Sequence, residues 1–184
     1  KAIKGGQASV VTDSIERFEA DGIVVGSGDK LEADVVITAT GFDLSVMGNI
    51  PFTVDGEPVD FADTVTWRGI MFTGVPNLAY VFGYFRSSWT LRADLISELV
   101  CRLLGNMDDK GSTMVVPELR PDEKGTPLLD WVEAENFNPG YLRRSMHLMP
   151  RQTGADPWRL RHDYTAEKDI LPNADLDDGC LIFK

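Results

Sequence analysis

Short apolar runs near the start of the chain alternate with turn-forming residues, which is the pattern of a β-meander. Three short strands are predicted, at residues 8–12, 15–20 and 23–25. Asp21-Gly22 lies between the last two and is typical of a two-residue hairpin. Residues 31–38 then carry three consecutive β-branched side chains, from Val35 to Ile37, as expected for a strand covered on both faces. The segment is therefore predicted as a meander that leads into a long buried strand.

The next part of the chain is irregular. Prolines and glycines interrupt residues 44–69, which are predicted as a loop with isolated short strands. Residues 70–73 and 78–82 are predicted as strands on either side of a tight turn at residues 75–77.

A long amphipathic helix is the strongest pattern in the chain. Ser87 and Ser88 are candidate N-caps, and Gly105 is the predicted end. Between them apolar residues recur at helical spacing: Leu95, Ile96, Leu99, Val100, Leu103 and Leu104. Residues 106–124 are rich in acidic residues, glycine and proline, and are predicted as a linker or a surface excursion.

Shorter helices are predicted in the last third. A capping residue precedes proline at residues 138–139 and 156–157, which is typical of a helix start. Helices are therefore expected at 139–148 and 157–169. Residues 175–184 are predicted as a tail with a small apolar end.

Composition and charge restrict the function. The 184 residues are 43% hydrophobic, enough for the core of one or two domains. Because 29 acidic and 18 basic side chains give a net charge of −11, binding to nucleic acid or to an anionic membrane is not expected. No apolar run approaches the ~20 residues that cross a bilayer, and residues 1–9 lack the apolar region of a secretion signal. The expected location is the cytoplasm.

Cysteine and histidine give no sign of a metal site. Cys101 and Cys180 are the only cysteines, are far apart in sequence, and are expected to be reduced. His147 and His162 lack a second ligand at metal-binding spacing, and each falls in a predicted helix among arginines. Both histidines are therefore interpreted as structural.

Residues 67–95 contain the best candidate for ligand contact. An apolar strand, a turn at Gly83, a serine cap and a helix follow in order, so free backbone N–H groups at the helix start would face an electron-rich ligand. Tyr84, Phe85 and Trp89 could support a planar ligand, although aromatic packing in a core is the ordinary explanation.

The charged clusters favour ordinary surface roles. Five arginines are expected to pair with acidic residues on helix faces: Arg143, Arg144, Arg151, Arg159 and Arg161. Asp130, Glu133 and Glu135 are interpreted as an exposed helix face. No nucleophile–base arrangement is recognisable, so no catalytic residue is assigned. Gly26 and Gly28 precede a strand instead of opening a helix, and are interpreted as a turn, not a phosphate loop.

Several stretches resemble the flavin-containing monooxygenases, particularly the bacterial branch close to Baeyer–Villiger and thioamide-activating monooxygenases. Residues 31–43 (LEADVVITATGFD) resemble the second Ala-Thr-Gly segment of that family. Residues 67–84 (WRGIMFTGVPNLAYVFGY) and 87–95 (SSWTLRADL) resemble its final FAD-domain strand and helix. Residues 138–152 (NPGYLRRSMHLMPRQ) and 156–164 (DPWRLRHDY) resemble its C-terminal helices.

The resemblance implies a larger enzyme. A full-length relative has an FAD loop and an NADP loop, both expected upstream of Lys1, together with any Baeyer–Villiger fingerprint. In the family NADPH reduces the flavin, and oxygen adds to give a hydroperoxyflavin. That species inserts one oxygen atom into a sulfur, amine or ketone group. This chain would then be an inactive C-terminal portion whose partners are the missing N-terminal half and a small-molecule substrate.

The resemblance also implies two groups of cofactor-binding residues. The crossing between the FAD and NADP domains would be formed by Ala39, Thr40, Gly41 and Phe42. The pyrimidine edge of the flavin would lie near Arg86, Ser87, Ser88, Trp89 and Thr90. Backbone N–H groups there would favour the charge on the reduced ring. A plain strand-exit turn and a capped surface helix are the respective alternatives.

The expected fold is α/β: an incomplete FAD-domain portion, with a β-meander, central strands and a long helix, followed by a C-terminal helical extension. Residues 1–105 would be the C-terminal part of the FAD/NADP-binding region, and residues 106–184 the linker and extension. Two alternatives stay open. A flavin disulfide or ferredoxin reductase shares the architecture, although the chain has no CxxC pair. A non-catalytic interaction module would bind a partner, or itself, through exposed apolar patches.

Overall fold

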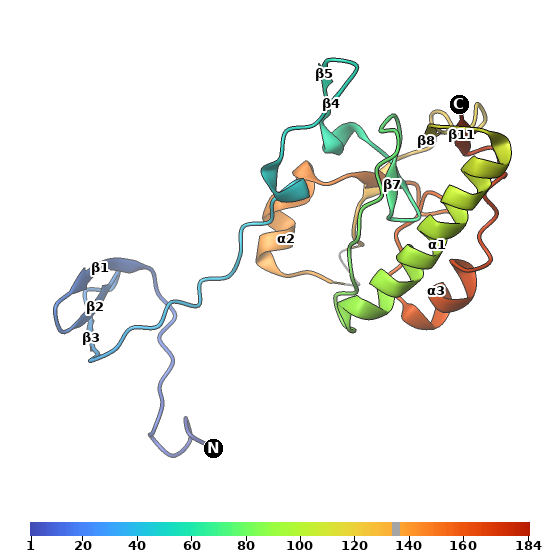
Figure 1. Ribbon diagram of the computed structural model, residues 1–184. Coiled ribbons are helices and arrows are strands. Elements are labelled where there is room, and N and C mark those ends of the chain that lie inside the picture. Colours follow the sequence, from blue (N-terminus) through green and yellow to red (C-terminus); the bar gives the residue numbers. More distant parts are fainter. Residues whose placement is uncertain (134–136) are drawn as a thin grey trace. The chain divides into compact units, whose positions relative to one another are not determined.

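The structure is a computed structural model that describes residues 1–133 and 137–184 (Figure 1). Its contacts divide the chain into two compact units, Lys1–Gly41 and Phe42–Lys184.

The first unit contains a three-stranded antiparallel sheet in the order β1-β2-β3, with β1 at Ile15–Glu19, β2 at Gly22–Val25 and β3 at Lys30–Glu32. The strands predicted at 15–20 and 23–25 and the hairpin between them are confirmed. Gly22 itself pairs with Glu19 and lies within β2. Its lack of a side chain matters because a Cβ there would collide with the Leu31 carbonyl of β3.

Two strand predictions in this unit are wrong. Residues 8–12 form no strand, and the long buried strand predicted at 31–38 ends with β3 at Glu32. Val35 is 75% exposed and Ile37 is 85% exposed. A β-branched run forms a buried strand only where neighbouring strands pair with it and other elements cover it. The residues that the structure describes supply neither, so the run is an exposed apolar segment.

The second unit begins with short elements joined by turns: η1 at Val46–Asn49, β4 at Thr53–Val54, β5 at Glu57–Pro58, η2 at Phe61–Asp63, β6 at Thr66–Trp67 and β7 at Met71–Phe72. The strands pair antiparallel as β4–β5 and β6–β7. This arrangement confirms the predicted loop at 44–69 and a strand within 70–73.

The strand predicted at residues 78–82 is not formed. The backbone of this segment forms hydrogen bonds, but they do not belong to a β-sheet. The Tyr80 N–H donates to the Ile70 carbonyl, and the Phe82 carbonyl accepts from the Arg92 side chain. Apolar composition predicted its burial at Phe82 but not its pairing.

Helix α1, Trp89–Lys110, is the long helix of the second unit (Figure 1). Its predicted end at Gly105 is wrong. Leu103 and Met107 are both buried and lie four residues apart, so the apolar stripe continues past the glycine. A glycine inside a helix costs only about 1 kcal/mol, which this burial offsets. The helix ends instead at Gly111, whose φ of 62° is left-handed.

A two-stranded sheet joins segments far apart in sequence. β8, Val115–Pro117, pairs antiparallel with β11, Leu181–Phe183. Residues 106–124 are therefore not a linker, and residues 175–184 are not a tail. Both predictions relied on the acidic and turn-forming residues around two short apolar runs. The runs pair with each other as β8 and β11, and this pairing outweighs the composition around them. The domain boundary predicted between residues 105 and 106 falls inside α1.

The remaining elements are α2 at Gly140–Ser145, η3 at Met146–Leu148, β9 at Leu129–Asp130, β10 at Arg151–Gln152 and α3 at Tyr164–Ile170. The helix predicted at 139–148 is confirmed as α2 and η3. β9 pairs antiparallel with β10.

Only the second half of the helix predicted at 157–169 is present, as α3. Trp158 and Leu160 are buried, and the residue after each is more exposed, which is the alternation of an extended chain. Asp163 then caps α3 by accepting the Thr165 N–H. The predicted capping residue before proline 157 therefore starts no helix, and Asp163, which was not predicted as a cap, takes that role.

Three buried clusters form the core of the second unit. The cluster next to the candidate site comprises Phe82, Trp131, Val132, Leu142, Met149 and Leu160. Among the described residues, no helix has the length and apolar character required to cross a membrane.

Candidate functional site

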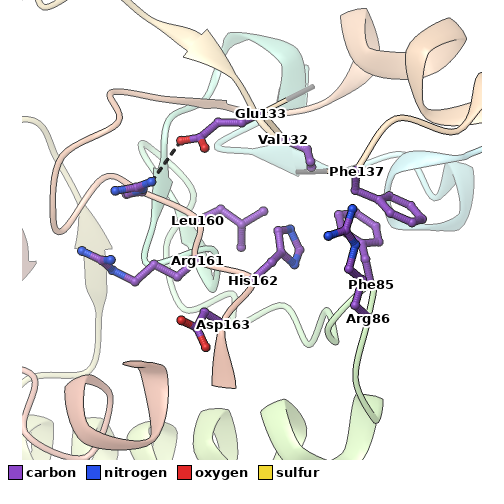
Figure 2. Close-up of a pocket in the computed structure, with 10 residues that line it drawn as sticks. Phe85, Arg86, Val132, Glu133, Phe137, Leu160, Arg161, His162 and Asp163 are labelled. Atoms are coloured by element: carbon purple, nitrogen blue, oxygen red, sulfur yellow. Dashed lines mark hydrogen bonds and ion pairs between the residues drawn. The ribbon is translucent and has the colours of Figure 1, made fainter. Parts of the chain in front are cut away.

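A pocket of about 250 Å³ lies in the second unit. Its walls come from the segment before α1, the segment after β9 and the extended segment before α3 (Figure 2). The lining residues are Phe85, Arg86, Val132, Glu133, Phe137, Arg159, Leu160, Arg161, His162 and Asp163. This volume suits a small molecule and falls below the roughly 300–1,000 Å³ of pockets for larger ligands.

Stacked rings form one wall of the pocket. The Phe85 ring is stacked on Phe137 with centroids 4.2 Å apart and planes 12° apart, and it lies 4.2 Å from the His162 ring at 33°. Figure 2 shows Leu160 beyond the His162 ring on the other side. The wall is therefore aromatic and aliphatic, and it suits the apolar body of a ligand.

His162 is neutral in this environment. Burial, followed by the charge of Arg92, lowers the pKa of His162 to about 3. Neither ring nitrogen has a hydrogen-bond partner in the part of the chain that the structure describes. His162 precedes α3 in an extended segment, so its predicted helical setting is wrong, while its place among aromatic rings agrees with a structural role.

The predicted pairing of the arginine cluster is confirmed for three members: Arg151 with Asp130 at 3.1 Å, Arg159 with Glu133 at 3.1 Å and Arg161 with Asp156 at 2.8 Å. All three lie on strand or extended segments, not on the helix faces that were predicted. Arg86, in contrast, is exposed and forms no ion pair with any described residue.

The acidic candidates are not on a helix. Asp130 belongs to β9, and the following Trp131 is buried, so the interpretation as an exposed helix face is wrong. Glu133 lines the pocket and binds Arg159, as the dashed line in Figure 2 marks. Glu135 lies outside the described residues. Across residues 1–133 and 137–184, no group of three or more acidic, His or Cys side chains could hold a metal ion.

A buried ion pair connects α1 with α3. Arg92 Nε donates to Glu167 Oε2 at 2.8 Å, and Nη2 donates to Oε1 at 3.0 Å. The same guanidinium donates to the carbonyls of Phe82 at 2.8 Å and Arg68 at 2.9 Å. The Tyr84 hydroxyl donates to Glu167 Oε2 at 2.6 Å. Burial, reinforced by this bond, raises the pKa of Tyr84.

This network was missed by sequence reasoning, although a signal existed. Arg92 lies four residues before Ile96 and seven before Leu99, within the apolar stripe of α1. A charged residue at a core position of an amphipathic helix requires a buried partner. The network fixes residues 82–84 against the start of α1, and so positions Phe85 and Arg86 at the pocket.

The two groups of predicted cofactor-binding residues differ in their setting. The second group is a continuous exposed run at the start of α1: Arg86, Ser87, Ser88, Trp89 and Thr90. Ser88 is the N-cap residue but makes no side-chain capping bond, and its Oγ lies 2.7 Å from Thr90 Oγ1. Among the described residues, no side chain accepts from the first-turn N–H groups. A Cβ at Gly83 would lie 2.7 Å from the Trp89 Cα, so glycine is required for this approach.

The first group spans the division between the units. Ala39, Thr40 and Gly41 end the first unit, and Phe42 begins the second. All four are exposed. Gly41 has a φ of 93°, which confirms the predicted need for glycine at this corner. Phe42 makes an edge contact with Tyr141 at 5.8 Å.

Comparison with known proteins identifies the relatives of the chain. It is 44% identical over 184 residues to "FAD-containing monooxygenase EthA" of Mycobacterium tuberculosis (strain ATCC 25618 / H37Rv). It is 42% identical to EthA of Mycolicibacterium smegmatis and 40% identical to "Probable FAD-binding monooxygenase AlmA" of Acinetobacter baylyi, each over 183 residues. Over its whole length the chain is a homologue of FAD-containing monooxygenases.

The family resemblance inferred from the motifs is thereby confirmed. The match covers all of this chain but only the C-terminal 36% of each of these relatives. The chain thus spans about one third of the length of these FAD-containing monooxygenases. No family model matches it, and no solved structure matches it.

Proposed function

We propose that the chain is the C-terminal part of an FAD-dependent monooxygenase that uses NADPH and inserts one oxygen atom into a small molecule. The acceptor would be a sulfur, an amine or a ketone, the last in a Baeyer–Villiger reaction. Identity of 40–44% to FAD-containing and FAD-binding relatives supports this assignment. The proposed location is the cytoplasm, in agreement with two free cysteines.

The start of α1 fits one edge of the flavin. FAD, when bound, supplies the redox chemistry that activates oxygen. The first-turn N–H groups lack a side-chain acceptor in the described part of the chain and would bind the electron-rich pyrimidine edge, with Trp89 exposed beside them. The buried Arg92–Glu167 pair would hold this turn in place. The first group, Ala39, Thr40, Gly41 and Phe42, would contact the cofactors at the crossing between the FAD and NADP domains.

The exposed apolar segment before Phe42 fits a contact with the rest of the longer enzyme. Val35, Ile37 and Phe42 are 75%, 85% and 73% exposed, and β-branched residues favour a paired strand. We propose that residues 33–42 pair with the N-terminal part of the enzyme and become covered there. The isolated chain would then be inactive and prone to self-association through this segment.

The test compares the 184-residue chain with a longer protein that contains the remaining two thirds found in its relatives. The longer protein should purify yellow with bound FAD, oxidise NADPH at 340 nm and consume oxygen. The chain alone should bind FAD far more weakly, because it has no Gly-rich loop for the pyrophosphate. A longer protein that takes up no flavin would refute the proposal.

The exposed apolar segment also fits an alternative function, that of a non-catalytic interaction module. Native mass spectrometry of the chain, with and without a separately produced N-terminal part, separates the two. Formation of a one-to-one complex that gains FAD and NADPH oxidation supports the enzyme. If the chain forms a stable self-associated species and does not bind the N-terminal part, the interaction-module alternative is supported.

A further inference from the structure

The pocket beside α1 has the features of a binding site for a small anion with a flat apolar body. Among the described residues, its lining includes three arginines and two carboxylates. The pKa of His162 lies far below neutrality, so this ring adds no charge. Glu133 and Asp156 balance two of the arginines, so the positive charge available to an anion is that of Arg86, on a chain whose net charge is −11.

The charged residues that line the pocket differ in whether they already form ion pairs. Arg159 binds Glu133, and Arg161 binds Asp156. The Asp163 carboxylate caps α3 through the Thr165 N–H. Arg86 is the lining cation that has no ion pair within residues 1–133 and 137–184. Its planar guanidinium can bind a carboxylate through two parallel hydrogen bonds.

The apolar wall of the pocket determines which kind of ligand body can bind. Phe85 lies between the rings of Phe137 and His162, at 4.2 Å from each, and its neighbour in sequence is Arg86 (Figure 2). One aromatic wall and one adjacent guanidinium match a ring that carries a carboxylate. The volume of about 250 Å³ admits a single-ring compound and excludes a dinucleotide.

We propose that this pocket binds small aromatic carboxylates, with the carboxylate on Arg86 and the ring against the edges of the stacked Phe85, Phe137 and His162 rings. This binding goes beyond the proposed monooxygenase activity and requires neither flavin nor turnover.

Isothermal titration calorimetry tests the proposal with benzoate, and with benzamide as its neutral isostere. The longer protein and the 184-residue chain are titrated in parallel. Benzoate should bind, and benzamide should bind at least about tenfold more weakly, because it lacks the charge-assisted bond to Arg86. Flavin content and NADPH oxidation are recorded separately, so a failed monooxygenase assay does not decide the binding result.

Four variants assign the binding to the pocket. Arg86→Gln should weaken benzoate at least about tenfold and leave benzamide unchanged, and Arg86→Lys should weaken benzoate less. Phe85→Leu should weaken both ligands by a similar factor, since it removes the ring but not the charge. Arg144→Gln is the control, because Arg144 is exposed and lies outside this pocket. The same urea midpoint in Arg86→Gln and wild type excludes an effect of misfolding.

Three outcomes would overturn the proposal: no heat with benzoate in either protein, equal affinity for benzoate and benzamide, or equal loss in Arg86→Gln and Arg144→Gln.

Discussion

Replacing Glu167 by glutamine should strongly destabilise the second unit. The substitution keeps the size of the side chain and removes the charge that balances Arg92. The Arg92 guanidinium is fully buried and would remain charged. It would keep its bonds to the carbonyls of Phe82 and Arg68, at 2.8 and 2.9 Å.

The expected magnitude follows from these contacts. Removing one partner of a buried ion pair costs about 3–5 kcal/mol. Because two carbonyl acceptors remain for Arg92, we expect the lower end of that range, about 3 kcal/mol. Tyr84→Phe removes only the 2.6 Å bond to Glu167 Oε2. A hydrogen bond to a charged group is worth about 1.5–3 kcal/mol, and Arg92 still satisfies this oxygen, so about 1.5 kcal/mol is expected.

Urea unfolding at pH 7, followed by tryptophan fluorescence, measures these differences, because Trp67, Trp131 and Trp158 are buried. The control is Glu98→Gln on the exposed face of α1, which should change the free energy of unfolding by less than about 0.5 kcal/mol. A loss below about 1 kcal/mol for Glu167→Gln would show that the pair is hydrated and that this reasoning is wrong.

Three further predictions concern single groups. The pKa of His162 is depressed to about 3, so the unfolded chain takes up a proton first as the pH falls below 6.5. The free energy of unfolding should therefore fall between pH 6.5 and 3, by about 2 kcal/mol at pH 5. Urea titrations of His162→Phe should lack this pH-dependent loss. Iodoacetamide at pH 8 should label exposed Cys101 and spare buried Cys180, whose pKa burial raises to about 12, as peptide mapping by mass spectrometry would show. Gly105→Ala faces open space inside α1 and should stabilise by up to about 1 kcal/mol, whereas Gly69→Ala, at a φ of 67°, should destabilise by more than that in the same urea assay.

Local patterns predicted the elements that depend on local interactions. The β1–β2 hairpin, α2 and the body of α1 were all found where periodicity and turn residues indicated them. Tight turns and amphipathic helices involve residues a few positions apart, so their sequence pattern already contains most of the information.

The predictions that were wrong have a different cause. β8 and β11 are each three residues long and lie more than sixty residues apart, and neither run alone distinguishes a strand from a linker or tail. The opposite error occurred at residues 33–38, the part of the predicted strand beyond β3, where a strong strand pattern lacks pairing partners in the described chain. Pairing is a property of two segments, so composition within one cannot decide it.

The candidate site shows the same limit. The family resemblance implied a place for Arg86 near the flavin, but its neighbours in the pocket, Phe137 and His162, come from segments about fifty and seventy-five residues later. The Arg92–Glu167 pair ties the start of α1 to α3, which follows His162 closely in sequence. The charge of Arg92 also contributes to the low pKa of that histidine. One buried guanidinium therefore helps to hold two of the pocket-lining segments in place and helps to keep His162 neutral, so a change at Arg92 should affect both ligand binding and folding.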